Sequence, residues 1–400
     1  MKPHDVCISG IGIVSALGAG CAIHSEALVN AKTGLSSQTF FTNEYAADFM
    51  CGLVPKTACK LSIEESAANR ANIFCEIASK QALLQAGISG AGKKKVDIII
   101  GTTSGNIHGA SRYFAQKKGN QDPDVSLVSN FIPASIADHA AAINSLQGKL
   151  LTVSSACASG TTAIGHAFRM VKNNRAQCVL AGGVDAVSPF IVAGFNSLRL
   201  LSKKHCSPFD ANRDGFNPGE ACAMVVVETV ESARTRGAIP LARICGYGEA
   251  LEAFHHTRSN PDGSGIAAVV TKAIECAGLS LESIDHVHCH GTATQVNDMS
   301  EYHGLKLLFE DRLKNIPICS SKSMTGHTLG AAGAVSVVLG ILSMQNSIVP
   351  ATLFHNDLDP QFTDLNIQKA PLKKDLRHVC TTSLGFGGET ASLLLERADI

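Results

Sequence analysis

Internal repetition constrains the fold of this chain more than any other feature of its sequence. Residues 85–105 ("QAGISGAGKKKVDIIIGTTSG") resemble residues 276–295 ("CAGLSLESIDHVHCHGTATQ"): a helix end, Ala-Gly, a short loop, a strand and Gly-Thr. Residues 153–167 ("VSSACASGTTAIGHA") are echoed by residues 319–334 ("CSSKSMTGHTLGAAGA"). Because the shared order survives unequal loop lengths, the pattern predicts a duplicated domain.

The two predicted halves meet in a polar stretch. Apolar runs rich in β-branched residues alternate with longer helical patterns, which favours an α/β fold with buried sheets. A boundary near residue 236, within "ESARTRGAIP", divides the chain into 1–235 and 236–400. Four hundred residues are enough for two core-forming domains.

Charge and cysteine usage exclude several classes of protein. The 34 Lys and Arg balance 34 Asp and Glu, so no field of one sign indicates nucleic acid or a membrane surface as partner. The 14 cysteines are scattered without a CxxC spacing, which indicates free thiols in a reducing, cytoplasmic compartment and no metal site. The apolar window at 331–344 is too short to span a bilayer and predicts a buried helix.

Cys157 stands where a strand gives way to a helix. The run 150–153 predicts a strand, and apolar residues recur at helical spacing from Ala163 onward. Unpaired backbone amides and the helix dipole favour a thiolate at such a helix start. A packed core thiol is the competing interpretation, but the small neighbours of Cys157 leave room for a substrate.

Histidines mark two further candidate positions. His286, His288 and His290 alternate along a strand, but without a further ligand cluster we do not expect them to hold a metal. His290 lies at the strand end, where functional residues of parallel sheets gather. Lys322 and His327 precede a helix of small residues, and the repeat predicts that this helix start faces that of Cys157.

Two glycine-rich stretches need separate interpretations. The glycines around Phe386 suggest a turn whose backbone amides can point inward, although taken alone this stretch is better explained as a simple strand connector. The N-terminal "SGIGIVSALG" is not a dinucleotide-binding fingerprint, because Ser15 stands where the third glycine is required.

Together these segments resemble the β-ketoacyl-acyl-carrier-protein synthases of the KAS I/II type, condensing enzymes of the thiolase superfamily. The matching stretches are "SSACASG", "FDANRDGF", "HGTAT", "SSKSMTGHTLGAAGA" and "GFGG", in this order from residue 154 to 388. The resemblance implies a duplicated thiolase-like fold with five α-β-α-β-α layers. It also implies that Cys157 is the acylated nucleophile, that His290 and His327 are the catalytic imidazoles, and that Lys322 orients them. Thr292 and Thr294 would bind the phosphopantetheine arm, and Phe386 would be the gating aromatic residue. Asp298 and Glu301 would be the acidic pair that supports Lys322.

This resemblance implies a decarboxylative condensation of malonyl-carrier with an acyl group on Cys157, without metal or redox cofactor. The 4'-phosphopantetheine arrives on the acyl-carrier protein, and the chain is expected to be a homodimer or a heterodimer with a related chain. Fatty-acid and specialised polyketide or polyene pathways both stay open, as does a role as catalytic subunit beside a chain-length factor. A thiolase would have a second cysteine after Cys380, and a non-catalytic partner would lack Cys157.

Three departures from the family pattern stand out. Glu389 and Thr390 follow "GFGG" where the family has Thr or Ser and then Asn. Residues 61–74 lack the usual cluster of carrier-docking cations and keep only Arg70 there, although Lys203 and Lys204 can contribute, and Arg112 falls in a region that often lines the acyl pocket.

Overall fold

The computed structural model describes residues 1–41, 46–59 and 69–398. Twelve strands of this part form one hydrogen-bonded sheet, which continues from one half of the chain into the other. The strands of the first half are β1 (Val6–Ser15), β2 (Gly18–Ala19), which pairs with β1 alone, β5 (Val96–Gly101), β6 (Leu150–Val153), β7 (Cys178–Asp185) and β8 (Ala221–Thr229). Those of the second half are β9 (Ala242–Leu251), β10 (His286–His288), β11 (Pro317–Cys319), β13 (Asn366–Ile367), β15 (His378–Leu384) and β16 (Glu389–Arg397).

The strand order confirms the predicted duplication. The first half runs β1-β8-β7-β5-β6, and the second runs β9-β16-β15-β10-β11 before β13 extends its edge. In each half the first three strands pair antiparallel and the next two pairings are parallel. Strands that share a position carry the repeated segments, so β5 corresponds to β10 and β6 to β11. Antiparallel pairing of β1 with β9 joins the halves.

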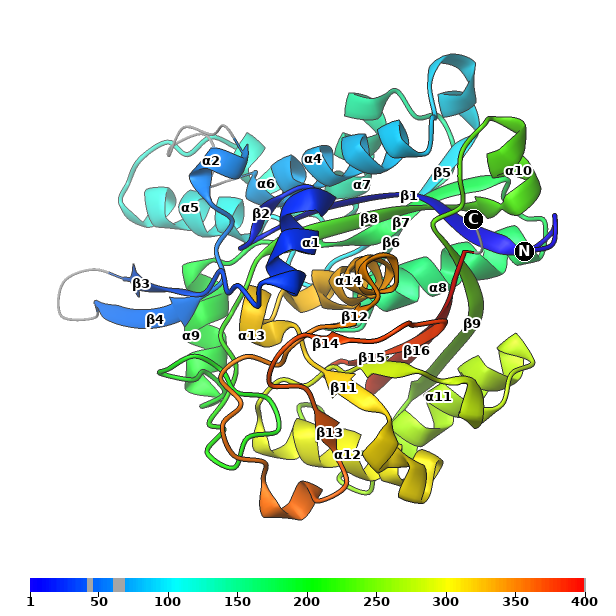
Figure 1. Cartoon of the computed structure of the whole chain (residues 1–400). Coiled ribbons are helices and arrows are strands. Elements are labelled where there is room, and N and C mark those ends of the chain that lie inside the picture. Colours follow the sequence, from blue (N-terminus) through cyan, green and yellow to red (C-terminus); the bar gives the residue numbers. More distant parts are fainter. Residues whose placement is uncertain (42–45, 60–68, 399–400) are drawn as a thin grey trace.

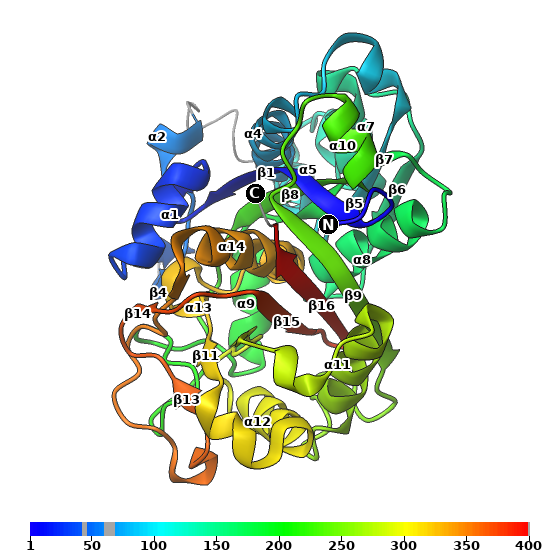
Figure 2. The ribbon, with the colours of Figure 1, turned by 45° about the vertical axis from the view of Figure 1, so that its right-hand side comes forward.

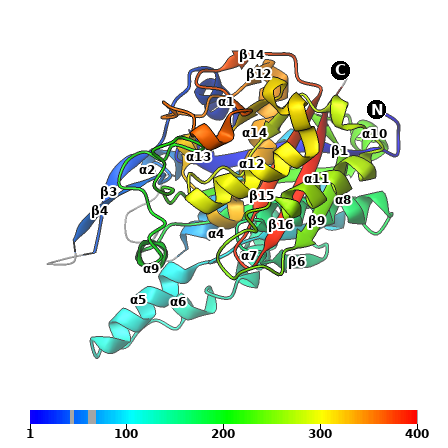
Figure 3. The same ribbon diagram turned by 90° about the horizontal axis from the view of Figure 1, so that it is seen from below.

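Helices separate and cover the two halves of the sheet in five layers (Figures 1 and 2). Helices α4 (Arg70–Gln85) and α7 (Ala134–Asn144) cover the outer face of the first half. Helices α11 (Ser264–Ala277) and α12 (Gln295–Phe309) cover the second, as the view from below shows (Figure 3). The middle layer is α8 (Ser159–Lys172) and α14 (Ala332–Asn346). The predicted five-layered fold is therefore confirmed.

Glycine pairs on corresponding strands let the outer helices approach closely. A Cβ added at Gly10 or Gly12 of β1 would lie 2.1 or 2.0 Å from a carbonyl oxygen of α4. At the equivalent Gly246 and Gly248 of β9, the distances to carbonyl oxygens of α11 are 1.9 and 2.0 Å. The repeated "CISGIG" and "RICGYG" segments thus encode the same helix-on-strand packing twice.

Helix α14 is the buried helix that the apolar window predicts. The expectation from its length is wrong, because the helical segment Leu329–Asn346 extends beyond the window and is long and apolar enough to cross a membrane by length and composition alone. Its burial is as predicted, since 89% of it lies inside the protein. Its neighbours are the core side chains of β8, β15 and α8. The window is therefore the central core helix of this fold.

Shorter elements surround these layers. They are α1 (Cys21–Val29), β3 (Ser36–Phe40), β4 (Ala47–Cys51), α2 (Lys56–Cys59), α5 (Ile107–Lys118), α6 (Ser126–Ser129), α9 (Pro189–Ser197), α10 (Val230–Thr235), α13 (Lys322–Thr325), β12 (Ile348–Val349) and β14 (Leu372–Lys373). The predicted boundary near residue 236 falls between α10 and β9 and stays a prediction.

Candidate active site

Cys157 lies in a tight turn between β6 and α8. Strand β6 ends at Val153, and the backbone reverses at Ala156, whose φ of 47° lies in the left-handed region. The Ser159 hydroxyl donates to the Ala156 carbonyl (2.6 Å) and accepts from the Ser155 amide (2.9 Å). These bonds fix the turn, so the predicted position of the thiol at a helix start is confirmed.

The expectation of a lowered pKa at Cys157 is wrong in this structure. The side chain is only 7% exposed, and burial raises the pKa of Cys157 to about 12. The Lys322 charge and the backbone amides of Phe386 and Cys157 lower the thiol pKa, while the Asp185 carboxylate raises it further. Desolvation outweighs the favourable groups, so the resting thiol is protonated.

His290 follows the end of β10 and is held by Lys322 from the start of α13. The Lys322 Nζ lies 3.3 Å from His290 Nδ1 and also donates to the His290 carbonyl oxygen. Because an ammonium group only donates, Nδ1 accepts and the ring proton sits on Nε2. Burial, together with the Lys322 charge and the electrostatic coupling to the His327 ring, holds the pKa of His290 well below 6.5, which keeps the ring neutral.

His327 has the same tautomer for a different reason. The backbone amide of Leu329 donates to His327 Nδ1 at 3.3 Å, so its Nε2 also carries the proton. Burial, together with Lys322, holds the pKa of His327 well below 6.5. The His290 and His327 ring centroids lie 5.3 Å apart at 85°. Two neutral N–H donors therefore lie side by side.

One cavity of about 370 Å³ brings most of the predicted residues together. Its lining includes Cys157, His290, Thr292, Thr294, His327 and Phe386. The hydroxyls of Thr292 and Thr294 lie 2.8 Å apart. The starts of α8 and α14 are in contact, as predicted. A Cβ atom added at Gly160 of α8 would collide with α14, and one added at Gly333 of α14 would collide with α8.

Asp298 and Glu301 act on this centre mainly through the backbone. Glu301 accepts from the amides of His290 and Gly291, each at 2.7 Å, and Asp298 accepts from the amide of Ala293 at 3.1 Å. Burial lowers the pKa of Lys322, and the two carboxylates oppose that effect through their charges. The predicted support of the lysine is thus electrostatic, while the hydrogen bonds of both carboxylates shape the loop after β10.

The glycine loop around Phe386 is anchored without the family's Asn. The Gly387 amide donates to the His256 carbonyl (2.8 Å), and the Glu252 amide donates to Gly388 (2.7 Å). Glu389 and Thr390, which depart from the family pattern, are the first residues of β16. The Thr390 hydroxyl donates to the Ala250 carbonyl at 3.1 Å. The segment after β9 therefore holds the loop, and the Phe386 amide reaches Cys157.

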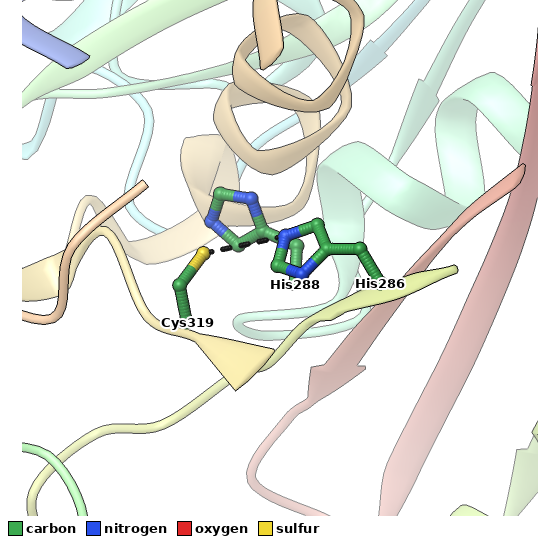
Figure 4. A group of neighbouring side chains, drawn as sticks. All are labelled: His286, His288 and Cys319. Atoms are coloured by element: carbon green, nitrogen blue, oxygen red, sulfur yellow. Dashed lines mark hydrogen bonds between the residues drawn. The ribbon is translucent and has the colours of Figure 1, made fainter. Parts of the chain in front are cut away.

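His286 and His288 meet a partner that the sequence pattern did not indicate, Cys319 on β11 (Figure 4). The Cys319 sulfur lies 3.5 Å from His286 Nε2, and His286 Nδ1 donates to the Pro317 carbonyl at 2.8 Å. Burial lowers the pKa of His286 to about 4 and raises that of Cys319. His288 is bonded elsewhere, through its Nε2 to the Ser321 hydroxyl at 3.0 Å, so the three side chains are neighbours in the core without forming one hydrogen-bonded chain. The expected absence of a metal stays a prediction.

Arg70, the one cation that the stretch 61–74 keeps, is held in an internal ion pair. Its guanidinium forms a bidentate ion pair with the fully buried Glu220, which also accepts from the Val54 amide at 2.8 Å. Residues 61–68 of the same stretch lie outside the described part of the chain. Lys203 and Lys204 are exposed as expected, while Arg112 is half-buried on α5 and does not line the cavity.

Two aromatic residues at the site, Phe195 and Phe216, were not predicted from the sequence. Phe216 packs edge-on against His327, with ring centroids 5.0 Å apart, and Phe195 of α9 packs against both Phe216 and Phe386. Phe216 lies in the loop "PFDANRDGFNPGEA", whose residues by themselves predict only a turn-rich connection. Its position beside His327 depends on a backbone bond from the His327 amide to the Asn217 carbonyl (2.7 Å).

Comparisons with known proteins agree with this geometry. The sequence profile of the beta-ketoacyl synthase N-terminal domain matches residues 4–233, and that of the C-terminal domain matches residues 241–355. The 3-oxoacyl-[acyl-carrier-protein] synthase 2 of Vibrio harveyi is 31% identical, with 99% of each chain covered.

Two solved structures are also similar over the whole chain. The ishigamide ketosynthase/chain length factor superposes with a TM-score of 0.91 at 27% identity, over 99% of this chain and 100% of that one. A type II polyketide ketosynthase, solved with its acyl-carrier protein and bound to the hexaketide, gives 0.90 at 25% identity over the same shares.

A duplicated five-layered fold with Cys157, His290 and His327 around one cavity defines a condensing enzyme of the thiolase superfamily. Within that class the chain belongs to the β-ketoacyl synthase family. It is an acyltransferase of the 3-oxoacyl-[acyl-carrier-protein] synthase type.

Proposed function

We propose that this enzyme condenses malonyl-carrier with an acyl group held on Cys157 and releases a β-ketoacyl chain two carbons longer. One observation carries the proposal: His290 and His327, each with its ring proton on Nε2, and Cys157 line one cavity. A nucleophile and two neutral donors are the groups that acyl transfer and enolate formation require.

In the first half-reaction, the sulfur of Cys157 attacks the thioester carbonyl of the acyl-carrier. The backbone amides of Phe386 and Cys157, which lie at the sulfur, donate hydrogen bonds to the developing oxyanion. The bond to the phosphopantetheine sulfur then breaks, and the thiol proton of Cys157 leaves with the departing thiol. The raised pKa of Cys157 makes proton loss part of this step.

In the second half-reaction, malonyl-carrier replaces the departed carrier. Its thioester oxygen accepts from His290 and His327 while the carboxylate leaves as carbon dioxide and its electron pair forms an enolate. The enolate carbon attacks the acyl carbonyl on Cys157, and the bond to sulfur breaks. Cys157 takes up one proton from solvent, which balances the cycle. Thr292 and Thr294 hold the phosphopantetheine arm, and no resident cofactor takes part.

The test uses the purified chain with acyl-carriers of several lengths and malonyl-carrier. We expect acylated Cys157 peptides by mass spectrometry and a β-ketoacyl product. Cys157→Ala abolishes condensation but keeps some malonyl decarboxylation, whereas His290→Ala and His327→Ala each suppress decarboxylation. Elongation by Cys157→Ala, or full decarboxylation by both histidine variants, contradicts the assigned roles.

We further propose that the chain works as one half of a two-chain assembly, either with its own copy or as catalytic subunit beside a chain-length factor. Strand β6 ends the hydrogen-bonded sheet, and its Leu150 and Leu151 are 41% and 45% exposed. An exposed apolar edge strand is a site of pairing with another chain. Ketosynthase/chain-length-factor pairs among the structural relatives favour the heterodimer and a polyketide or polyene pathway.

Light scattering of the chain alone and of the chain co-expressed with neighbouring ketosynthase-like genes distinguishes the two assemblies. Leu151→Arg is expected to yield a monomer in either case. A wild-type chain that is a stable monomer and does not bind a co-expressed partner rejects the assembly. The 14 unpaired cysteines, Cys157 among them, support a reducing, cytoplasmic location.

A further inference from the structure

A buried carboxylate on the first half of the chain holds together segments from both halves. Asp185, the last residue of β7, is fully buried and accepts from donors in two places. After β5, the Thr103 amide donates to it (2.8 Å), as do the Thr102 hydroxyl (2.9 Å) and the Ser104 amide and hydroxyl (2.9 and 2.8 Å). Before α14, the Gly330 amide donates at 2.7 Å.

The first group of donors leads to the nucleophile. Thr103, whose amide binds Asp185, donates its hydroxyl to the carbonyl oxygen of Ala156 at 3.0 Å. Ala156 is the residue with positive φ that directly precedes Cys157. Asp185 therefore fixes the backbone of the Cys157 turn through a single intervening residue.

The second donor leads to an imidazole. Gly330 directly follows Leu329, whose amide sets the tautomer of His327 by donating to Nδ1. A Cβ at Gly330 would lie 2.6 Å from the Asp185 carboxylate and 2.7 Å from the Thr103 amide, so the three groups are in close contact. Leu329 itself has a φ of 51°, a conformation that needs support from its neighbours.

We propose that Asp185 is a positioning residue of the condensation site, which locks the Cys157 turn and the His327 segment into one fixed arrangement. This inference rests on the proposed function and adds a residue to it. Asp185 touches no substrate; it acts through Thr103 on the nucleophile and through Gly330 and Leu329 on the imidazole. Its charge also acts on the thiol directly, since it raises the pKa of Cys157.

The carboxylate is suited to this role because its donors converge from separate elements. Three of them are backbone amides, which can only donate, so an amide side chain at this position would turn its NH₂ toward another N–H group. A displacement of about 1 Å at a reacting group costs on the order of 10²-fold in rate. Asp185→Asn is nearly the same size and removes the charge and half of the acceptor capacity.

The experiment measures two partial reactions separately in the full chain. Acylation of Cys157 is followed by mass spectrometry with acetyl-, octanoyl- and palmitoyl-carrier, and decarboxylation is followed by carbon dioxide release from malonyl-carrier. Asp185→Asn is expected to lower kcat about 10²-fold in both reactions. KM is expected to stay near the wild-type value, because Thr292 and Thr294 are unchanged.

Thr103→Val separates the two routes. It removes the hydroxyl bond to Ala156 but keeps the backbone amide for Asp185. We therefore expect slower acylation with wild-type decarboxylation, and little further loss when Thr103→Val is added to Asp185→Asn. Should Asp185→Asn fail to fold, wild-type acylation by Thr103→Val overturns the proposal.

Glu228→Gln is the matched control. Glu228 is equally buried and accepts from Ser9, Ser232 and Arg236, but it lies on β8 away from the cavity. Its substitution is expected to lower stability while both rates per folded molecule stay at the wild-type value. Equal losses per folded molecule in Asp185→Asn and Glu228→Gln, or wild-type rates in Asp185→Asn, reject the positioning role. Failure of the wild type in both reactions instead rejects the proposed function.

Discussion

The Nζ of Lys322, at the start of α13, lies 3.3 Å from the Nδ1 of His290, in the loop after β10. This contact assigns the ring proton of His290, which lines the cavity, to Nε2. It also places a cation near Cys157, whose pKa it lowers against the effect of burial. One side chain thereby acts on both the imidazole and the nucleophile.

Replacing Lys322 tests this double role. In Lys322→Met the Nδ1 of His290 loses its donor, so the other tautomer becomes populated and malonyl decarboxylation falls roughly 10²-fold. Alkylation of Cys157 by iodoacetamide also slows at a given pH, because the thiol pKa rises. The surface variant Lys306→Met, which loses only an ion pair with Asp364, serves as the control. Wild-type decarboxylation in Lys322→Met contradicts the assignment.

The pH dependence of decarboxylation reports on the two imidazoles. Burial lowers the pKa of both His290 and His327 well below 6.5, so both rings stay neutral as the pH falls through that value. Protonation at Nδ1 would oppose the donors of Lys322 and Leu329, and activity is lost only at much lower pH. A pH–rate profile of Cys157→Ala should be flat between roughly pH 8 and pH 6. An inflection near 6.5 would show that the rings are solvated.

Substitution of Arg70 distinguishes an internal ion pair from a carrier-docking residue. Arg70→Ala leaves the Glu220 carboxylate buried without its cation, which should lower the free energy of unfolding by about 3 kcal/mol in a urea titration. The KM for acyl-carrier should not change. Lys203→Ala, at an exposed cation, is expected to change stability by less than about 0.5 kcal/mol. A raised KM with unchanged stability in Arg70→Ala would restore the docking role.

Gly12, one of the two glycines of β1, tests the close packing of strand and helix. In Gly12→Ala the new methyl group would lie 2.0 Å from the Ala78 carbonyl, so α4 must move and the free energy of unfolding should fall by about 3 kcal/mol. Gly194→Ala in α9 meets nothing within 4 Å and should leave stability unchanged or slightly raised. Similar thermal midpoints for the two variants would be inconsistent with this packing.

Much of the architecture is predictable from the sequence because it depends on local patterns repeated in order. The duplicated segments predict two equivalent halves, and the strand orders agree with them. The run 150–153 and the helical spacing after it predict where Cys157 stands, since a strand-to-helix transition is encoded by nearby residues. The apolar window at 331–344 predicts the helix α14, whereas its burial inside the protein is shown by the tertiary packing and not by its length.

The resemblance of the motifs to a known family also indicates which residues converge. Their order along the chain says nothing of distance, but the repeat predicts that the starts of α8 and α14 face one another. The cavity lined by Cys157, His290 and His327 agrees with that expectation. The roles assigned to these residues remain predictions for the experiments above.

By itself the sequence determined the duplicated fold, the placement of each chemical group on its strand or helix, and the class of chemistry. Only the tertiary structure decided the protonation of those groups and their long-range partners. The thiol of Cys157 has a raised pKa because the fold removes water from it, and Arg70 turns inward because Glu220, far away in sequence, comes within reach. Asp185 gains its importance in the same way, because the fold brings to it the donors after β5 of its own half and the Gly330 amide of the other half.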